Sequence, residues 1–200
     1  MAEQTVAAIA TPNAAGGIGI VRISGGDALS VASKVFVPAK RALTLADVPG
    51  YTALFGTVVE ATGEAVDQAI CLVFRAPASY TGEDVVELQC HGGMYLMQKV
   101  LRLVLAAGAE PAGPGEFTKR AFLNGKLDLT QAEAVIDLID AETAAAARNA
   151  VAQLDGGLRR VLEPIQDALL DISSRFYAVV DYPDEDIEDI RPEDVAQALH

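Results

Sequence analysis

The sequence predicts a mixed α/β (α+β) N-terminal domain over residues 1–125, followed by an all-α helical segment over residues 126–200. Two patterns support this division. Up to the Asn124-Gly125 turn, short β-branched runs alternate with stretches of helical periodicity, whereas only helical periodicity follows that turn. The joint is the stretch GPGEFTKRAFLNGKLDLTQAEAVIDLIDA, from Gly113 to Ala141, which combines two turns, several basic residues and a strong helix start.

Before the joint, alternating or β-branched runs predict strands over residues 5–10, 19–24, 52–60, 65–74, 85–90 and, more briefly, 108–111. The third and fourth of these flank an Ala-Thr-Gly-Glu turn and are expected to form a hairpin. Helical spacing predicts helices over residues 26–36 and 94–107, with a brief helix near residues 117–122. Residues 41–50 are expected to be a connection.

After the joint, a first helix is expected from the capping box Thr130-x-x-Glu133, or from the competing start Asp128-x-x-Gln131, to about residue 154. A second helix over residues 158–180 spaces its apolar side chains by alternating gaps of four and three residues, which is typical of a helix that pairs along its length. This seam consists of Leu158, Leu162, Ile165, Leu169, Ile172, Phe176 and Val179.

The short gap between these two helices predicts an antiparallel hairpin. Pro164 is expected to kink the second helix or to mark a false start. Pro192 begins a third helix only nine residues from the last residue, so we expect the chain to be a fragment of a longer protein.

Composition favours a globular cytoplasmic protein. Hydrophobic residues make up 51% of the chain, yet no apolar run is long enough to span a membrane, and residues 1–10 do not have the pattern of a signal peptide. Two cysteines fit a reducing compartment. Eight acidic residues between Asp181 and Asp194 contribute to the net charge of −13, and they are expected to be a solvated turn rather than a partner-binding tail.

Several classes of site are disfavoured by the sequence. The acidic balance argues against a chain that grips RNA by itself. Gly16, Gly17 and Gly19 lack the third glycine of a dinucleotide fingerprint, and no phosphate-binding loop of the form G-x-x-x-x-G-K-[ST] occurs. With two His and two scattered Cys, no metal-ligand cluster is visible. We therefore expect no metal site, no catalytic residue and no GTP binding or hydrolysis in this chain alone.

Two charges inside strands are hard to explain by packing alone. Arg22 lies inside an apolar strand. One interpretation without a ligand is an arginine at a sheet edge, whose aliphatic part covers apolar surface while its guanidinium reaches water. Glu87 also lies inside a strand, where it either pairs with Arg22 or Lys126 or awaits donors from a ligand. Cys71 is expected to pack as a small hydrophobe, and His91 to serve turn chemistry and helix capping.

Four blocks in order give the chain a family resemblance: TVAAIATPNAAGGIGIVRISG, SYTGEDVVELQCHGG, the joint, and DYPDEDI. It resembles the bacterial tRNA-modification GTPases of the MnmE/TrmE family over essentially its whole length. Two departures stand out. Residues 12–15 lack a basic residue often found there, and Gly113 replaces an arginine. Either change would weaken an anionic contact without altering the fold.

The resemblance implies an N-terminal domain similar to the tetrahydrofolate-binding aminomethyltransferases, which forms a homodimer and binds 5-formyltetrahydrofolate near the dimer interface. Carried over position by position, the folate residues are Arg22, Glu87 and Lys126. GTP, Mg²⁺ and K⁺ belong to a GTPase domain outside this chain. With a flavoprotein partner, the whole enzyme modifies C5 of the wobble uridine of tRNA, and no membrane is involved.

Chemistry agrees with this assignment, because a carboxylate accepts the paired donors of a pterin, and cations suit the carboxylates of the folate tail. Arg22 and Lys126 could instead contact the formyl oxygen. Two other functions stay open: a pure dimerisation and assembly module without folate binding, and a free-standing folate-dependent one-carbon transferase.

Overall fold

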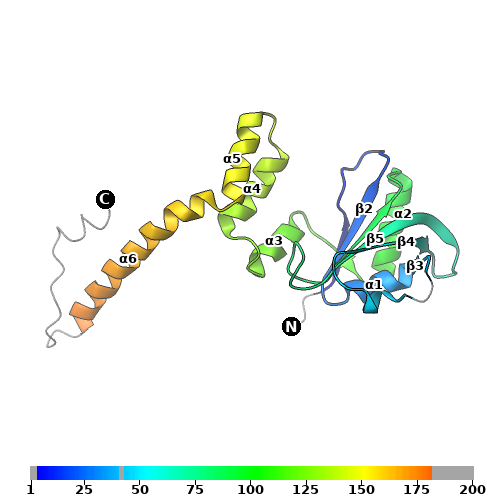
Figure 1. Cartoon of the computed structure of the whole chain (residues 1–200), viewed down its shortest axis with the longest axis horizontal. Coiled ribbons are helices and arrows are strands. Elements are labelled where there is room, and N and C mark those ends of the chain that lie inside the picture. The colour runs from blue at the N-terminus through cyan, green and yellow to red at the C-terminus, as the bar shows by residue number, and fades with distance from the viewer. Residues whose placement is uncertain (1–3, 41–42, 182–200) are drawn as a thin grey trace. The chain divides into compact units, whose positions relative to one another are not determined.

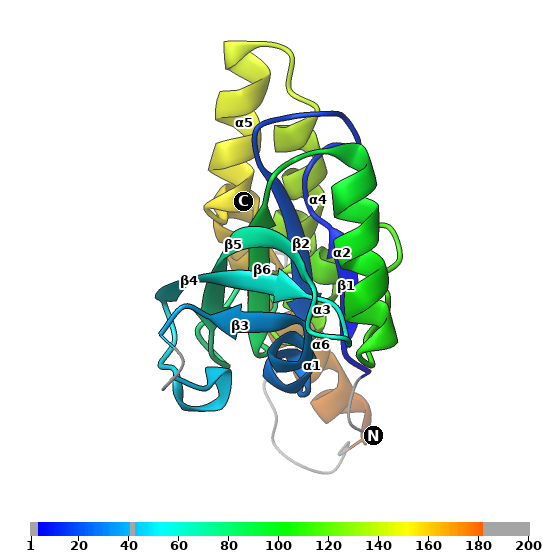
Figure 2. The same cartoon turned by 90° about the vertical axis from the view of Figure 1, so that its right-hand side faces the viewer.

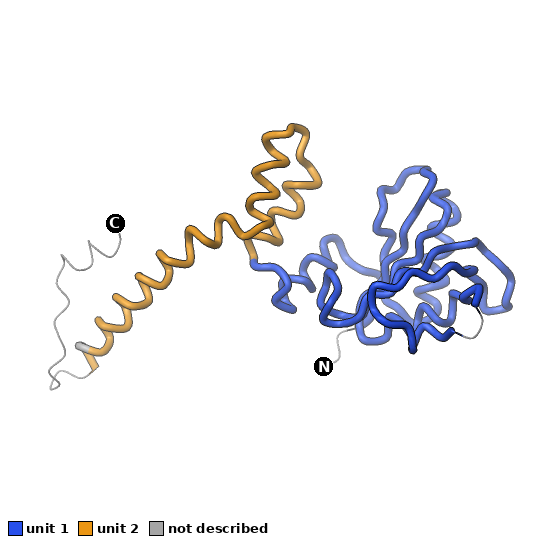
Figure 3. Tube along the Cα trace, viewed as in Figure 1, with its two compact units in different colours: residues 1–128 blue, residues 129–200 orange. Residues whose placement is uncertain are grey.

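A computed structural model describes residues 4–40 and 43–181, which fall into two compact units, unit 1 up to Asp128 and unit 2 from Leu129 (Figure 3). Figure 1 labels the elements of both units. The strands of unit 1 are β1 (Val6–Ile9), β2 (Gly19–Ser24), β3 (Phe36–Pro38), β4 (Thr52–Val59), β5 (Ala65–Phe74), β6 (Val85–Cys90) and β7 (Glu110–Pro111). Its helices are α1 (Ala28–Val35), α2 (Met94–Ala106), α3 (Glu116–Leu123) and the 3₁₀ turn η1 (Leu45–Asp47).

The seven strands form one sheet in the order β3-β4-β5-β6-β2-β1-β7, so β3 and β7 are the outermost strands. All neighbouring pairs are antiparallel except β1 and β7. The predicted β4–β5 hairpin is confirmed, with Gly63 at φ +86° in its turn. The expected helix over residues 26–36 ends one residue early, because Phe36 already pairs with Val58 of β4.

Helices α1 and α2 pack on one face of the sheet, and Figure 2 shows both helices beside the strands. Side chains alternate along a strand, so every second residue meets these helices. On β2, for example, Val21 and Ile23 are fully buried in this core, as the period-two pattern predicts. The core is completed mainly by apolar residues of β5 and β6 and by Val100 and Val104 of α2.

Both cysteines belong to this core. Burial raises the pKa of the Cys71 thiol to about 12. Burial, and then the nearby Asp67 carboxylate, raise the pKa of the Cys90 thiol to about 12. An exposed thiol titrates near ~8.5, so the folded state holds these protons more tightly than the unfolded state. Their stabilising effect is complete below pH ~8.5 and is lost as the pH rises towards 12.

We therefore expect both thiols to resist alkylation in the native protein at pH 8, because thiolate is the reactive species and little of it is present. Iodoacetamide labelling followed by mass spectrometry checks this expectation. Two labels should appear rapidly in 8 M urea and almost none without urea. Native labelling at the rate of a free thiol would contradict the burial of Cys71 and Cys90.

Unit 2 contains α4 (Leu129–Ile139), α5 (Ala144–Leu154) and α6 (Gly157–Asp181). Helix α4 begins directly after Asp128, which agrees with the start predicted from Asp128-x-x-Gln131 and not with the capping box at Thr130. The single helix expected up to residue 154 is wrong. It divides at residues 140–143, because the Thr143 side chain accepts a hydrogen bond from the Ala146 N–H and caps a new helix.

The expected hairpin between the first long helix and residues 158–180 is also wrong, because α4 packs against α5 instead. Helix α6 runs through Pro164, and four residues of its apolar seam are about half exposed. Leu162, Ile165, Leu169 and Phe176 are each between 46% and 59% exposed. Pro192 and nearly all of the acidic run lie outside the described residues. Within the described part of the chain, no helix has the length and apolar character needed to cross a membrane.

Candidate ligand-binding site

The face of the sheet opposite α1 and α2 carries the first two candidate residues. Arg22 of β2 lies directly across from Glu87 of β6, and Glu87 lies across from Leu72 of β5. The adjacent row on the same face ends in Ile70 and Phe55, which are 43% and 58% exposed. This open face is therefore a largely apolar surface with an ion pair near its centre.

Arg22 and Glu87 are in direct contact. The Arg22 Nε–H donates to Glu87 Oε1 at 2.7 Å, and the two side chains are 26% and 13% exposed. Strand β2 is an inner strand of the sheet, so the interpretation of Arg22 as a sheet-edge residue is wrong. The alternative that Glu87 pairs with Arg22 is confirmed. The remaining Glu87 oxygen and the terminal Arg22 nitrogens make no hydrogen bond to any described residue.

Two aromatic rings flank the guanidinium of Arg22. Its Cζ lies 5.2 Å from the centre of the Phe117 ring, on α3, and 5.7 Å from the centre of the Tyr80 ring, in the loop before β6. The Tyr80 hydroxyl is also hydrogen-bonded to the Thr118 hydroxyl at 2.9 Å. These contacts bring together three segments that are distant in sequence. No local pattern in the sequence identifies either ring as part of the site.

Lys126 lies against the same loop that carries Tyr80. Its Nζ donates to the Pro77 carbonyl oxygen at 3.1 Å, and its side-chain carbons lie beside Gly82. Among the described contacts, none joins Lys126 to Glu87 or Arg22. The structure thus places Arg22 and Glu87 together and places Lys126 against the loop that carries Tyr80. The alternative pairing of Glu87 with Lys126 is not found.

A buried ionic cluster beneath this loop was not anticipated from the sequence. Arg120 of α3 is 4% exposed, and its Nη1 donates to both carboxylate oxygens of Glu83 at 3.0 and 3.1 Å. Arg120 Nε donates to Glu116 Oε1, and Nη2 donates to the Gln4 carbonyl oxygen. Glu83 in turn accepts from the Ser24 hydroxyl at 2.6 Å. The cluster joins α3, the loop and the end of β2. Only the four-residue spacing of Glu116 and Arg120 could have indicated it.

His91 does not cap a helix, contrary to expectation. Helix α2 has Gly93 at its N-cap with no side-chain hydrogen bond. The His91 ring Nδ1 lies 2.7 Å from Asp67 Oδ1, and the His91 backbone N–H donates to Asp67 Oδ2. His91 therefore ties the segment before α2 to β5, because the Asp67 carboxylate binds both the ring nitrogen and the backbone N–H of His91.

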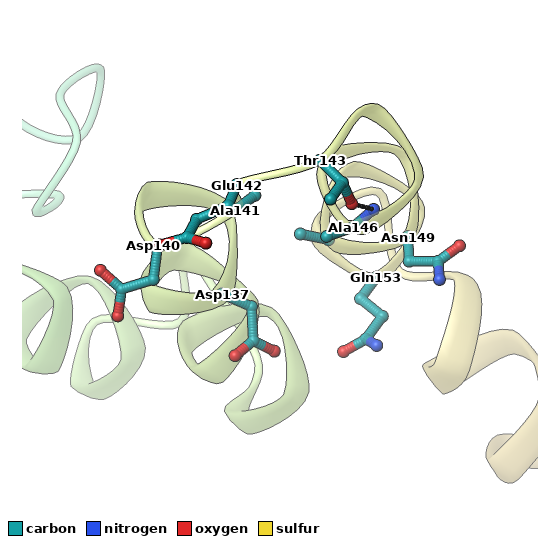
Figure 4. A pocket seen from close by; sticks show the side chains of 9 residues that line it. Asp137, Asp140, Ala141, Glu142, Thr143, Ala146, Asn149 and Gln153 are labelled. Carbon is teal, nitrogen blue, oxygen red and sulfur yellow. Dashed lines mark hydrogen bonds between the residues drawn. The ribbon is translucent and has the colours of Figure 1, made fainter.

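A separate pocket of about 480 Å³ lies within unit 2, between α4 and α5. Figure 4 shows its polar lining, with Asp137 on α4, Asp140 and Glu142 in the turn, and Asn149 on α5. Within residues 4–40 and 43–181, no group of three or more His, Cys, Asp or Glu side chains is arranged to hold a metal ion. None of Arg22, Glu87 and Lys126 lines this pocket.

Comparison with known proteins identifies the family. A sequence profile described as "GTP-binding protein TrmE N-terminus" matches residues 5–126, and one described as "MnmE helical domain" matches residues 129–200. The chain belongs to the MnmE (TrmE) family of tRNA modification GTPases. The predicted family and the predicted mixed α/β domain followed by helices are thereby confirmed.

Curated MnmE relatives align along nearly the whole chain. A protein named "tRNA modification GTPase MnmE" from Symbiobacterium thermophilum is 52% identical over 196 residues, covering 98% of this chain and 43% of the relative. The proteins of the same name from Carboxydothermus hydrogenoformans and from a strain of Thermus thermophilus are 47% and 48% identical, covering 96% and 94% of this chain. The chain therefore spans less than half the length of these MnmE proteins, 42% and 43% for the latter two.

Proposed function

We propose that residues 1–125 are the folate-binding, dimerising domain of a cytoplasmic tRNA modification GTPase, and that residues 126–200 begin its helical domain. The whole protein would act with a flavoprotein partner on C5 of the wobble uridine of tRNA. Family membership supports the assignment to tRNA modification. The observation that carries the folate proposal is the Arg22–Glu87 pair, held on the open face with hydrogen-bonding groups to spare.

The geometry suits the chemistry of 5-formyltetrahydrofolate. Glu87 Oε1 accepts one hydrogen bond from Arg22 and has a second lone pair, and Oε2 accepts from no described residue, so the two oxygens together can accept the adjacent N–H and amino donors of the pterin. The terminal nitrogens of Arg22 and the ammonium group of Lys126 are cationic partners for the carboxylates of the folate tail or for the formyl oxygen. To bind such a ligand, the ammonium group of Lys126 would give up only its hydrogen bond to the Pro77 carbonyl oxygen.

Calorimetric titration of 5-formyltetrahydrofolate tests the proposal. We expect saturable binding, and we expect Glu87→Gln to weaken it by at least about 10-fold, or about 1.4 kcal/mol, because a charge-assisted acceptor is lost. The glutamine oxygen can still accept a hydrogen bond from Arg22 Nε. The free energy of unfolding without ligand should therefore change by only about 1 kcal/mol, since the pair is partly exposed. The exposed Glu64 provides the control, since Glu64→Gln should leave affinity unchanged.

Other outcomes separate the alternatives. A dimer without measurable folate binding would support a pure assembly module. Turnover of a folate substrate by this chain alone would support a one-carbon transferase. Unchanged folate affinity in Arg22→Ala, Glu87→Gln and Lys126→Ala would remove the site assignment.

We also expect the chain to self-associate through unit 1. The exposed Phe55 and Ile70 on the open face give a second copy an apolar surface to cover. Light scattering should give about twice the monomer mass of 20.9 kDa, and a version ending near Gly125 should remain dimeric. The exposed apolar residues of α6 are a second surface on which a dimer could form. Removing α6 therefore shows which of the two surfaces holds the dimer together. A monomeric short version beside a dimeric full chain would assign the dimer to the helices.

A further inference from the structure

The two rings beside Arg22 have a consequence for ligand binding. Phe117 is half-buried on α3, and Tyr80 is 40% exposed in the loop before β6, yet both lie within 6 Å of the same guanidinium carbon. A guanidinium over an aromatic face is attracted by the negative face of the ring. Arg22 is therefore held by two rings in addition to its bond with Glu87.

Each of these contacts fixes a different part of the side chain. Glu87 takes the Nε–H, so the guanidinium cannot rotate freely about its own axis. Phe117 and Tyr80 restrict movement of the guanidinium plane, and the Tyr80 ring is itself held through Thr118. An arginine on a solvent-facing surface normally samples many rotamers, and ordering it on binding reduces affinity. Here the ordering is already present without a ligand.

We propose that Phe117 and Tyr80 are positioning residues of the site, which hold the terminal nitrogens of Arg22 ready for an anionic group of the ligand. This inference rests on the proposed function, in which the ligand is a folate with carboxylate and formyl oxygens. The rings act through Arg22 rather than by touching the ligand. The helix that carries Phe117 also carries buried Arg120, so the ring stands on a fixed support.

Titrations of 5-formyltetrahydrofolate into the full chain test this role. Phe117→Leu should weaken binding about fivefold, as expected for the loss of a partly desolvated cation–π contact. Phe122→Leu is the matched control on the same helix and should stay within twofold of the unchanged protein. Tyr80→Phe keeps the ring and loses only the bond to Thr118, so its effect should be smaller than that of Tyr80→Leu.

A double-mutant cycle with Arg22→Ala distinguishes positioning from direct contact. In the Arg22→Ala background, Phe117→Leu should change affinity by less than twofold, because there is no guanidinium left to hold. An equal loss in both backgrounds would show that the ring contacts the ligand or supports the fold, and would overturn the proposal. In that case folate binding by the unchanged protein would still stand.

A ligand-free measurement tests the same claim if no folate binds. In ¹⁵N-edited NMR spectra at pH 7, the Arg22 Nε–Hε signal should be resolved and slow to exchange, with Arg22→Ala providing its assignment. Phe117→Leu should shift this signal and speed its exchange, whereas Phe122→Leu should not. An unaltered Arg22 signal in Phe117→Leu would contradict positioning by the ring, whether or not the protein binds folate.

Discussion

Arg120→Met should lower the free energy of unfolding by about 3–5 kcal/mol, the range typical of removing one partner from a buried ion pair. Arg120 is 4% exposed, and its guanidinium neutralises Glu83 and Glu116 together. Methionine fills similar volume but leaves the Glu83 carboxylate without its cation and leaves Glu116 with only the long contact to Lys119. It also leaves the Gln4 carbonyl oxygen without its donor. The loop before β6 should then loosen together with α3.

Urea titration followed by circular dichroism measures this effect. Lys119→Met is the matched control, because Lys119 is the adjacent residue but has a 64% exposed side chain and only one long contact, to Glu116 at 3.6 Å. Surface pairs of this kind contribute little, so the control should change stability by less than about 1 kcal/mol. Equal effects of the two substitutions would show that the Arg120 cluster adds no stability beyond that of a surface charge.

Gly92→Ala should destabilise the protein by about 2–3 kcal/mol, whereas Gly93→Ala should cost about 1 kcal/mol or less, the loss expected when alanine replaces glycine at the N-cap of α2. A Cβ at Gly92 would lie 2.6 Å from the Gly16 carbonyl oxygen and 2.8 Å from backbone atoms of Ile18. These are main-chain atoms that cannot rotate away, and the Gly16 N–H already donates to the Gly92 carbonyl oxygen. A Cβ at Gly93 would meet only Leu96 Cβ, at 3.9 Å.

The two glycine variants can be compared by their urea midpoints under identical conditions. Because the residues are adjacent and the substitution is the same, changes in the unfolded chain largely cancel, and only Gly93→Ala carries the cost of alanine at the N-cap of α2. A loss of stability at Gly93 as large as at Gly92 would mean that backbone freedom, not the approach of the 12–18 loop, sets the requirement for glycine here.

Local patterns predicted most of unit 1. Strands β2, β5 and β6 begin and end where the sequence indicates, since each has a β-branched or alternating run with turn residues at its ends. Strand β3 was missed because three residues carry no periodicity, and its formation depends on pairing with β4. The break before α5 is hard to predict because the alanine-rich run after Thr143 continues the helical pattern, and the only local signal is a threonine that can cap a helix.

The site was predictable only in part. Arg22 and Glu87 stand out as charges inside apolar strands, and their pairing was one of the alternatives considered. Tyr80 and Phe117 could not be found, because aromatic residues in a loop and a short helix have many ordinary packing roles, and their approach to Arg22 depends on the tertiary fold. Arg120 has the same local appearance as Lys119, and only burial distinguishes the two.

The two outermost strands limit how another chain can join this sheet. β3 has three residues and β7 has two, and each ends in a proline, Pro38 or Pro111. Proline has no N–H to offer, and such short edges present few groups for strand-to-strand hydrogen bonding. Extension of the sheet by a strand from a second copy is therefore disfavoured at both ends. A dimer of unit 1 is therefore expected to form mainly through side chains, so single surface substitutions should change its stability.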